Sequence, residues 1–237
     1  MKWIKVSSYE EMSKVACSIF VKQLQHKSNS VLGFATGGSP VGFYKEIVKS
    51  YQAGEISFDH VRSFNLDEYI GIPSNSPASY YSYMVENFFQ HVNISKENYH
   101  LPDGNAIDLK EECVRYDKSI EESGGIDLQL LGIGVNGHIA FNEPGTSFAS
   151  LTNIVNLTES TRIENARYFE NIADVPTQAI TMGIQSIMNT KKIVLTAFGD
   201  KKVAAIDQLY SGKITEDYPA SQLLMHPNLT VIYGSEG

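Results

Sequence analysis

Residues 132–145, GIGVNGHIAFNEPG, place a histidine, a glutamate and a proline directly after a glycine-rich turn. Glu143 follows His138 by five residues, which lets its carboxylate orient the imidazole and fix its tautomer. An imidazole held in this way can donate or accept a proton near neutral pH. We therefore predict that His138 and Glu143 form an acid–base pair, with a buried structural histidine as the alternative.

The start of this stretch, residues 132–137, also matches G-x-G-x-x-G, the turn that binds dinucleotides. Such a turn continues into a long helix packed on a sheet, but Pro144 lies only seven residues after Gly137. Glu159 nevertheless stands at a suitable distance for an acid that binds the ribose. A nicotinamide-dependent oxidoreductase is therefore kept as an alternative, and NAD binding would test it.

Two adjacent carboxylates, Asp67 and Glu68, come just after an apolar segment at residues 61–65 that is typical of a strand. Carboxylates at the end of a strand can supply a general base or bind a metal ion. A solvated loop that caps a helix is the alternative. We favour a functional role because the acids end a strand of the predicted sheet.

A second glycine-rich turn, ATGGSP at residues 35–40, leads from an apolar strand into a helix. Backbone N–H groups in such a turn can bind phosphate, since glycines let the backbone approach and the helix dipole favours negative charge. The sequence predicts Ser39 as the N-cap and Pro40 as the first helical residue. The Gly-Lys-Ser/Thr signature of a P-loop is absent. An ordinary tight turn is the alternative to a phosphate site.

Two basic residues, Arg167 and Lys201, each follow a predicted strand and could pair with a phosphate group. Taken one at a time, each is more simply explained as a surface charge. Together with the turn at residues 35–40, they would supply the local positive charge that an anionic substrate of an acidic protein requires.

These residues need a scaffold that brings the ends of separate strands together. Apolar segments alternate with helical patterns, which predicts an α/β fold: a mostly parallel open sheet with helices on both faces, a modified Rossmann-like arrangement. Ligands of such sheets bind beyond the carboxyl ends of the strands. The predicted strands are residues 3–6, 31–34, 61–65, 126–131, 152–157, 178–181, 192–197 and 229–233, and the predicted helices include 12–24, 40–50, 108–122 and 201–210.

The whole chain of 237 residues fits one domain, residues 1–237, without a linker or an internal repeat. No apolar run approaches the roughly 20 residues that span a bilayer, and no signal peptide is evident. The formal charge of −8 argues against nucleic acid and anionic lipid as partners. We expect a cytoplasmic protein whose two cysteines, Cys17 and Cys113, are reduced and lie in the core.

The combined pattern closely resembles the glucosamine-6-phosphate deaminases, also called glucosamine-6-phosphate isomerases. The resemblance spans nearly the whole chain in order, and its most specific part is the run from His138 to Pro144. The related 6-phosphogluconolactonases share the glycine-rich turn found here at residues 35–40 and a Gly-His pair. The matching segments are ATGGSP at 35–40, FNLDEYIG at 64–71, SYYSYM at 79–84, GHIAFNEPG at 137–145 and ITMGI at 180–184.

The resemblance implies conversion of D-glucosamine 6-phosphate and water into D-fructose 6-phosphate and ammonia, without a metal or an organic cofactor. By similarity, Asp67 is the base of the enolisation, and His138, oriented by Glu143, opens the sugar ring. Asn136 stands where some members carry an aspartate that assists the histidine, so we expect it to fix the imidazole through its amide. The implied contacts with the substrate phosphate are Thr36, Gly37, Gly38, Ser39, Arg167 and Lys201.

Members activated by N-acetylglucosamine 6-phosphate carry basic residues after the Glu-Pro pair and have a longer C-terminus. Here residues 151–156, LTNIVN, contain no lysine or arginine. We therefore expect hyperbolic, effector-independent kinetics and a monomer or small homo-oligomer. Residues 80–83 and 160–169 are candidates for a segment that closes over the sugar.

Two further alternatives share the fold. A 6-phosphogluconolactonase would hydrolyse a lactone and release no ammonia. A sugar-phosphate-sensing module of a transcription regulator should carry a DNA-binding segment, and no basic helix-turn-helix pattern is present. The sequence leaves open the preference between glucosamine and galactosamine 6-phosphates and the direction of flux.

Overall fold

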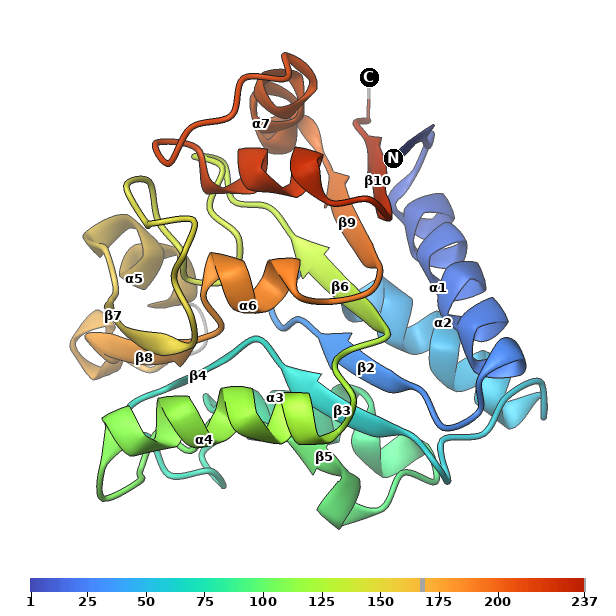
Figure 1. The fold of residues 1–237 in the computed structure, drawn as a ribbon, viewed down its shortest axis with the longest axis horizontal. Helices are drawn as coiled ribbons and strands as arrows, with labels where there is room; N and C mark the ends of the chain where they lie inside the picture. The colour runs from blue at the N-terminus through green and yellow to red at the C-terminus, as the bar shows by residue number, and fades with distance from the viewer. Residues whose placement is uncertain (167–168, 237) are drawn as a thin grey trace.

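A computed structural model describes residues 1–166 and 169–236 of the chain. Its main sheet has seven strands in the order β1-β10-β9-β6-β2-β3-β5, and every neighbouring pair is parallel (Figure 1). The predicted mostly parallel sheet is thus confirmed. The strands are β1 (Lys2–Lys5), β2 (Val31–Phe34), β3 (Arg62–Asn65), β5 (Tyr99–His100), β6 (Leu128–Gly132), β9 (Ile193–Phe198) and β10 (Leu229–Gly234).

Helices cover both faces of this sheet, as the sequence predicts. Figure 1 shows α4 and α6 in front of the strands and α2 behind them. Short 3-10 helices η1 (Phe89–His91), η2 (Lys96–Asn98), η4 (Ile172–Asp174) and η5 (Pro219–Met225) fill connections. The α-helices are α1 (Tyr9–His26), α2 (Val41–Gln52), α3 (Tyr80–Asn87), α4 (Leu109–Glu122), α5 (Glu159–Asn165), α6 (Ile184–Met188) and α7 (Asp200–Tyr210).

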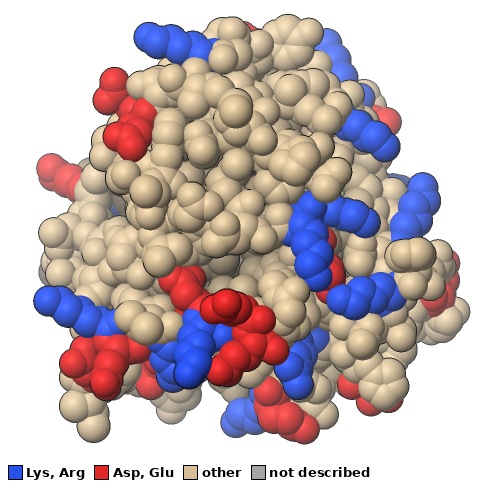
Figure 2. Space-filling model, viewed as in Figure 1, with Lys and Arg blue, Asp and Glu red and all other residues tan. Residues whose placement is uncertain are grey.

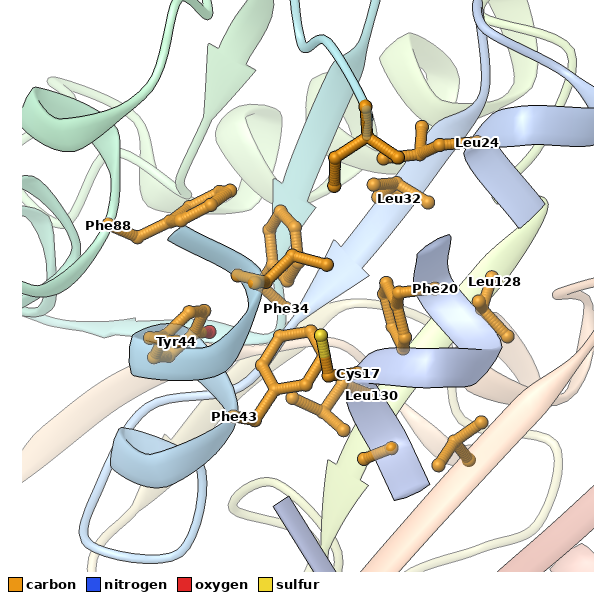
Figure 3. Close-up of a cluster of buried hydrophobic side chains, with 14 of the residues drawn as sticks. Cys17, Phe20, Leu24, Leu32, Phe34, Phe43, Tyr44, Phe88, Leu128 and Leu130 are labelled. Carbon is orange, nitrogen blue, oxygen red and sulfur yellow. The ribbon is translucent and has the colours of Figure 1, made fainter. Parts of the chain in front are cut away.

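Alternate residues of the buried strands enter two different cores, which is why these strands are apolar throughout. Leu32 and Phe34 of β2 face the core formed with α1 and α2, whereas Val31 faces the core on the side of α4 and α7. In Figure 3, Phe34 lies among aromatic rings from both sides, with its centroid 6.1 Å from that of Phe20 and 5.1 Å from that of Phe88. These offset and edge contacts stabilise the strand at the point where the second glycine-rich turn begins.

A second, smaller sheet departs from the expectation of a single sheet. Its strands are β4 (Asp67–Tyr69), β8 (Gln178–Thr181) and β7 (Asn153–Asn156), and both pairings are antiparallel. The segments predicted as strands at 152–157 and 178–181 therefore do not join the main sheet. Short apolar strands reveal their own conformation but not their partner, which is why the sequence pattern does not predict this pairing.

Helix ends follow ordinary capping chemistry with one correction. The side chains of Ser8 and Asp108 accept hydrogen bonds from the first backbone N–H groups of α1 and α4. The predicted N-cap Ser39 is wrong by one residue, because Pro40 occupies the cap of α2 and no side chain caps it. Ser39 is thereby left to the turn that precedes the helix.

Both cysteines are free and buried, Cys17 in α1 and Cys113 in α4, as predicted. Burial raises the pKa of each thiol to about 11, so neither is a reactive thiolate at neutral pH. None of the helices in the described part of the chain is both long and apolar enough to cross a bilayer.

On the face drawn in Figure 2, most charged side chains lie toward the lower and right-hand edges, with acidic and basic groups beside one another. In the structure, the carboxylate of Asp127 lies 2.6 Å from the ammonium of Lys27 and 2.8 Å from that of Lys191. Neighbouring opposite charges partly cancel, so an anionic substrate needs positive partners inside its own site.

Candidate active site

A cavity of about 150 Å³ lies at the carboxyl ends of β2, β3 and β6. This position is the one expected for a ligand site in a parallel sheet. The volume is below the range of about 300–1,000 Å³ usual for drug-sized ligands, which indicates a small ligand. Its lining is Ala35, Thr36, Gly37, Gly38, Ser39, Leu66, Asp67, Tyr80, Gly132, Ile133, Gly134, His138, Ala140, Phe141, Thr161, Asn165 and Lys202.

The glycine-rich turn at residues 35–39 is held from outside by tyrosine hydroxyls. Tyr44 of α2 donates to the carbonyl of Ala35 at 2.6 Å, and Tyr83 of α3 donates to the carbonyl of Gly37 at 2.7 Å. The hydroxyl of Tyr9 lies 2.9 Å from the carbonyl of Ser39. With its carbonyl oxygens engaged by these phenols, the turn is fixed in one orientation.

The opposite side of the same turn can bind an anion. Within the described chain, the backbone N–H groups of Gly37, Gly38 and Ser39 donate to no protein acceptor. Gly37 has φ of 95°, a left-handed conformation that glycine adopts without strain. Unpaired N–H groups just before a helix N-terminus form a site for phosphate. The predicted residues Thr36 to Ser39 are thus brought together at the cavity.

Among the described residues, Lys202 lines the cavity, whereas the predicted Lys201 is not part of the lining. Lys202 lies on the same helical face as the buried residues Ala205, Ile206 and Leu209, whereas Lys201 is exposed. Spacings of three, four and seven residues from Lys202 define that face, so helical phase decides between the two lysines. The other predicted basic residue, Arg167, lies outside the described residues.

Asp67 is a buried carboxylate that opens into the cavity. Asp67 is only 6% exposed, and none of the described residues donates a hydrogen bond to its carboxylate. Burial, reinforced by the nearby charge of Glu68, raises its pKa from 3.8 to about 8. A carboxylate with this pKa is a stronger base than an exposed one and still ionises near neutral pH.

The adjacent carboxylate, Glu68, has a structural role. It accepts hydrogen bonds from the backbone N–H groups of Tyr69, Tyr80 and Tyr81 at 2.9, 3.0 and 2.8 Å. Two of these donors belong to the first turn of α3, so Glu68 fixes the start of that helix. Of the two predicted acids, only Asp67 is available to a substrate.

The glycines of the G-x-G-x-x-G stretch serve the histidine. A side chain at Gly134 would overlap the imidazole of His138, so glycine is required for the ring to occupy its place. Gly137 has φ of 83°, and a Cβ there would overlap the ring of Tyr218. Between β6 and β7 the chain forms turns and no helix, which removes the structural basis for dinucleotide binding.

The loop after His138 is strained and firmly held. Ala140 lines the cavity with φ of 50°, the left-handed region that non-glycine residues seldom adopt. The buried side-chain amide of Asn142 donates to the carbonyls of Ile139 and Met182 at 3.0 and 2.9 Å. Because Met182 directly follows β8, these bonds connect the loop to that strand. The surrounding hydrogen bonds therefore maintain the left-handed conformation at Ala140, which places this part of the loop in the cavity wall.

His138 and Glu143 lie side by side but do not share a hydrogen bond. The Nδ1 atom of His138 is 3.7 Å from Oε2 of Glu143 and has no hydrogen-bond partner among the described residues. Asn136 acts on the pair differently from the expectation that its amide would fix the ring. Its Nδ2 donates to Oε2 of Glu143 at 2.7 Å, and its Oδ1 accepts the backbone N–H of His138 at 3.2 Å.

Glu143 is an ionised carboxylate throughout the neutral range. Burial would raise its pKa, but His138, the hydroxyl of Thr161 and the amide of Asn136 together lower it to about 2. A carboxylate of this kind stabilises an adjacent imidazolium and does not exchange protons itself. The pKa values of Asp67 and Glu143 thus differ by several units, so the two carboxyl groups can perform separate tasks.

Several residues of the cavity were not among the sequence candidates. Thr161 and Asn165 lie four residues apart on one face of α5, and Tyr80 begins α3. The segments 80–83 and 160–169 had been named only as candidates for a closing element, and each contributes to the wall. Helical spacing is the signal that could have identified Thr161 and Asn165.

The chain matches the family model of glucosamine-6-phosphate isomerases and 6-phosphogluconolactonases over residues 7–232. A glucosamine-6-phosphate deaminase of Lysinibacillus sphaericus is 67% identical over 234 residues, with 99% of each chain covered. One of Thermoanaerobacter pseudethanolicus is 52% identical over 236 residues, with 100% of this chain and 93% of the relative covered.

Solved structures agree with these similarities. A monomeric glucosamine-6-phosphate deaminase superposes with a TM-score of 0.97 at 46% identity, over 100% of this chain and 98% of the other. A 6-phosphogluconolactonase of Thermotoga maritima gives a TM-score of 0.77 at 18% identity, over 99% of both chains. The second similarity shows a shared fold.

Proposed function

The chain belongs to the family of glucosamine-6-phosphate isomerases and 6-phosphogluconolactonases, and we propose that it converts D-glucosamine 6-phosphate and water into D-fructose 6-phosphate and ammonia. One observation carries the proposal: a buried base, an imidazole beside an ionised carboxylate, and a turn with free N–H groups line the same small cavity. Isomerisation of an amino sugar requires one acid–base group for the ring and another for the carbon acid. The close relatives named for this activity support the same choice.

The phosphate group binds to the turn at residues 36–39 and to Lys202. The N–H groups of Gly37, Gly38 and Ser39, which have no acceptor in the described part of the chain, support this assignment, as does the lysine in the first turn of α7. A dianionic phosphate is held by charge-assisted hydrogen bonds from such donors. Arg167, by resemblance, belongs to the same set. Binding at this end places the sugar toward Asp67 and His138, which line the rest of the cavity.

His138 opens the sugar ring. It moves a proton from the anomeric hydroxyl to the ring oxygen, so that the C1–O5 bond breaks and an aldehyde forms at C1. The ionised Glu143, 3.7 Å from Nδ1, stabilises the imidazole when it carries the extra proton. Asn136 contributes by holding Glu143 with its amide.

Asp67 then removes the proton from C2 of the open-chain sugar. The electron pair left on C2 forms a C1–C2 double bond while the aldehyde oxygen accepts a proton. Return of the proton from Asp67 to C1, with loss of one proton from the nitrogen, gives an imine at C2. Water adds to that carbon and ammonia leaves, which balances the reaction as fructose 6-phosphate plus ammonia. The raised pKa of Asp67 supports its role as the base for a weak carbon acid.

We propose one catalytic domain over residues 1–237 that works as a monomer in the cytoplasm, without an allosteric effector. The match over residues 7–232 and the similarity to a monomeric deaminase support the domain and the monomer. The absence of lysine and arginine from residues 151–156 supports effector-independent kinetics.

The test is a turnover assay on wild-type protein that follows ammonia and fructose 6-phosphate together. Equal amounts of both products from glucosamine 6-phosphate are expected. A parallel assay with 6-phosphogluconolactone addresses the hydrolase alternative, since that reaction releases no ammonia. A folded protein that hydrolyses the lactone and leaves the amino sugar untouched would refute the proposal.

A further inference from the structure

The helix α5 is tied directly to the carboxylate of Glu143. Thr161, in the first turn of α5, donates its hydroxyl to Oε1 of Glu143 at 2.7 Å. Thr158, the N-cap of the same helix, places its hydroxyl 3.3 Å from that oxygen. A helix that forms one wall of the cavity therefore contacts the acid that serves the histidine.

The contacts of Glu143 divide evenly between its two oxygens. Oε2 accepts from the amide of Asn136 at 2.7 Å and lies 3.7 Å from Nδ1 of His138. Oε1 accepts from Thr161 at 2.7 Å and lies 3.3 Å from the hydroxyl of Thr158, and no other described residue bonds to it. A carboxylate held at both oxygens cannot rotate about its terminal bond, so the α5 contacts determine which way Oε2 faces.

Thr161 is the better placed of the two threonines for this role. It is only 6% exposed, and its hydroxyl proton is directed to Glu143 while Thr158 donates to its oxygen at 2.9 Å. Thr158 has a second task, because its Oγ1 accepts the backbone N–H of Thr161 as the helix cap. Substitution of Thr158 would disturb the helix, whereas Thr161 can lose its hydroxyl alone.

We propose that Thr161 is a positioning residue that fixes the Glu143 carboxylate for its contact with His138. This inference rests on the proposed function, since His138 acts there in ring opening. Thr161 acts through Glu143, to which its hydroxyl proton is donated. Because the donor to Glu143 belongs to α5, the position of this helix determines the orientation of the Glu143 carboxylate beside His138.

The test compares Thr161→Val, which keeps the shape of the side chain and removes the hydroxyl, with Thr161→Ser, which keeps the hydroxyl. Thr190→Val is the matched control, because Thr190 is 5% exposed, its Oγ1 has no partner among the described residues, and it lies outside the cavity. Loss of a hydrogen bond to a charged group predicts a fall in kcat of about 10- to 100-fold for Thr161→Val, with KM within about twofold.

Thr161→Ser should restore most of kcat, and Thr190→Val should match the wild type. A kcat for Thr161→Val equal to that of Thr190→Val would overturn the proposal, and so would a loss that serine does not restore. A structural role of Thr161 alone would lower the thermal stability of Thr161→Val and would leave kcat of the folded variant unchanged.

A second measurement does not require the substrate. Titration of the Glu143 carboxyl by carbon-13 NMR should give a pKa of about 2 in the wild type and a higher value in Thr161→Val, where a donor is lost. An unchanged titration would refute the contact. If the wild type releases no ammonia, the proposed function fails, and this titration still decides whether Thr161 holds Glu143.

Discussion

Replacement of Asp67 by asparagine should abolish turnover and stabilise the fold at the same time. The amide has nearly the shape of the carboxyl group but cannot accept the proton from C2. General-base catalysis contributes about 10²- to 10⁴-fold, so kcat should fall by at least about 100-fold. The substrate should still bind, because the phosphate contacts at residues 36–39 and Lys202 are untouched.

The stability gain follows from the pKa of Asp67, which rises from 3.8 to about 8 on folding. Between these values the native state holds a proton that the unfolded chain has released, so the stability of the wild type decreases as pH rises. At about 1.4 kcal/mol per pH unit, the unfavourable contribution is about 4 kcal/mol at pH 7 and about 6 kcal/mol well above pH 8. Below pH 4 it vanishes. Asparagine lacks this contribution at every pH.

Urea unfolding of wild type and Asp67→Asn between pH 5 and 9 measures the difference directly. The difference in unfolding free energy should widen with pH up to about 8 and then level off, because the carboxyl of Asp67 is the group that the substitution removes. In the wild type alone, kcat/KM should rise with pH to a plateau above about 8. Asp59→Asn, at an exposed carboxylate, should change neither stability nor rate. A pH-independent difference, or more than about a hundredth of wild-type kcat in Asp67→Asn, would refute the reasoning.

Three further predictions concern the rest of the site. Lys202→Met should raise KM about 10- to 100-fold through loss of a charge-assisted contact with phosphate, while Lys201→Met, at the exposed neighbour, should leave KM unchanged; equal effects in steady-state assays would contradict the assignment. Gly134→Ala should lower kcat about 100-fold, because the new methyl group displaces the imidazole of His138 by about 1 Å. A folded alanine variant with normal kcat would show that the ring has another productive position. Initial rates should follow a hyperbola in glucosamine 6-phosphate, and a sigmoidal curve that N-acetylglucosamine 6-phosphate relieves would disprove effector independence.

The sequence predicts the scaffold well, because the main sheet depends on patterns that are local in the chain. Apolar strands such as Val31–Phe34 and capped helices such as Leu109–Glu122 are formed by their own residues. The second sheet is different. Pairing of Asp67–Tyr69 with Gln178–Thr181 joins segments more than 100 residues apart, and nothing in either segment specifies the other.

The site was predicted in its residue types and less well in its contacts. Asp67, His138 and Glu143 meet at one cavity or beside it, as their positions after strands indicate. The sequence cannot show that Asp67 has no hydrogen-bond partner among the described residues, or that Asn136 holds Glu143 instead of the imidazole. Both facts depend on side-chain directions that arise only when separate loops fold against one another.

A side chain added at Gly134 would overlap the imidazole of His138, and this overlap limits how the two positions can change during evolution. Neither position can change freely while the other is kept, so the two should vary together among related sequences. A relative that has lost the histidine is released from the requirement for glycine and can accumulate larger residues at the equivalent of position 134. A relative with a bulky residue there should lack ring-opening activity, and the glycine therefore serves as a marker of catalytic competence in sequences known only from genomes.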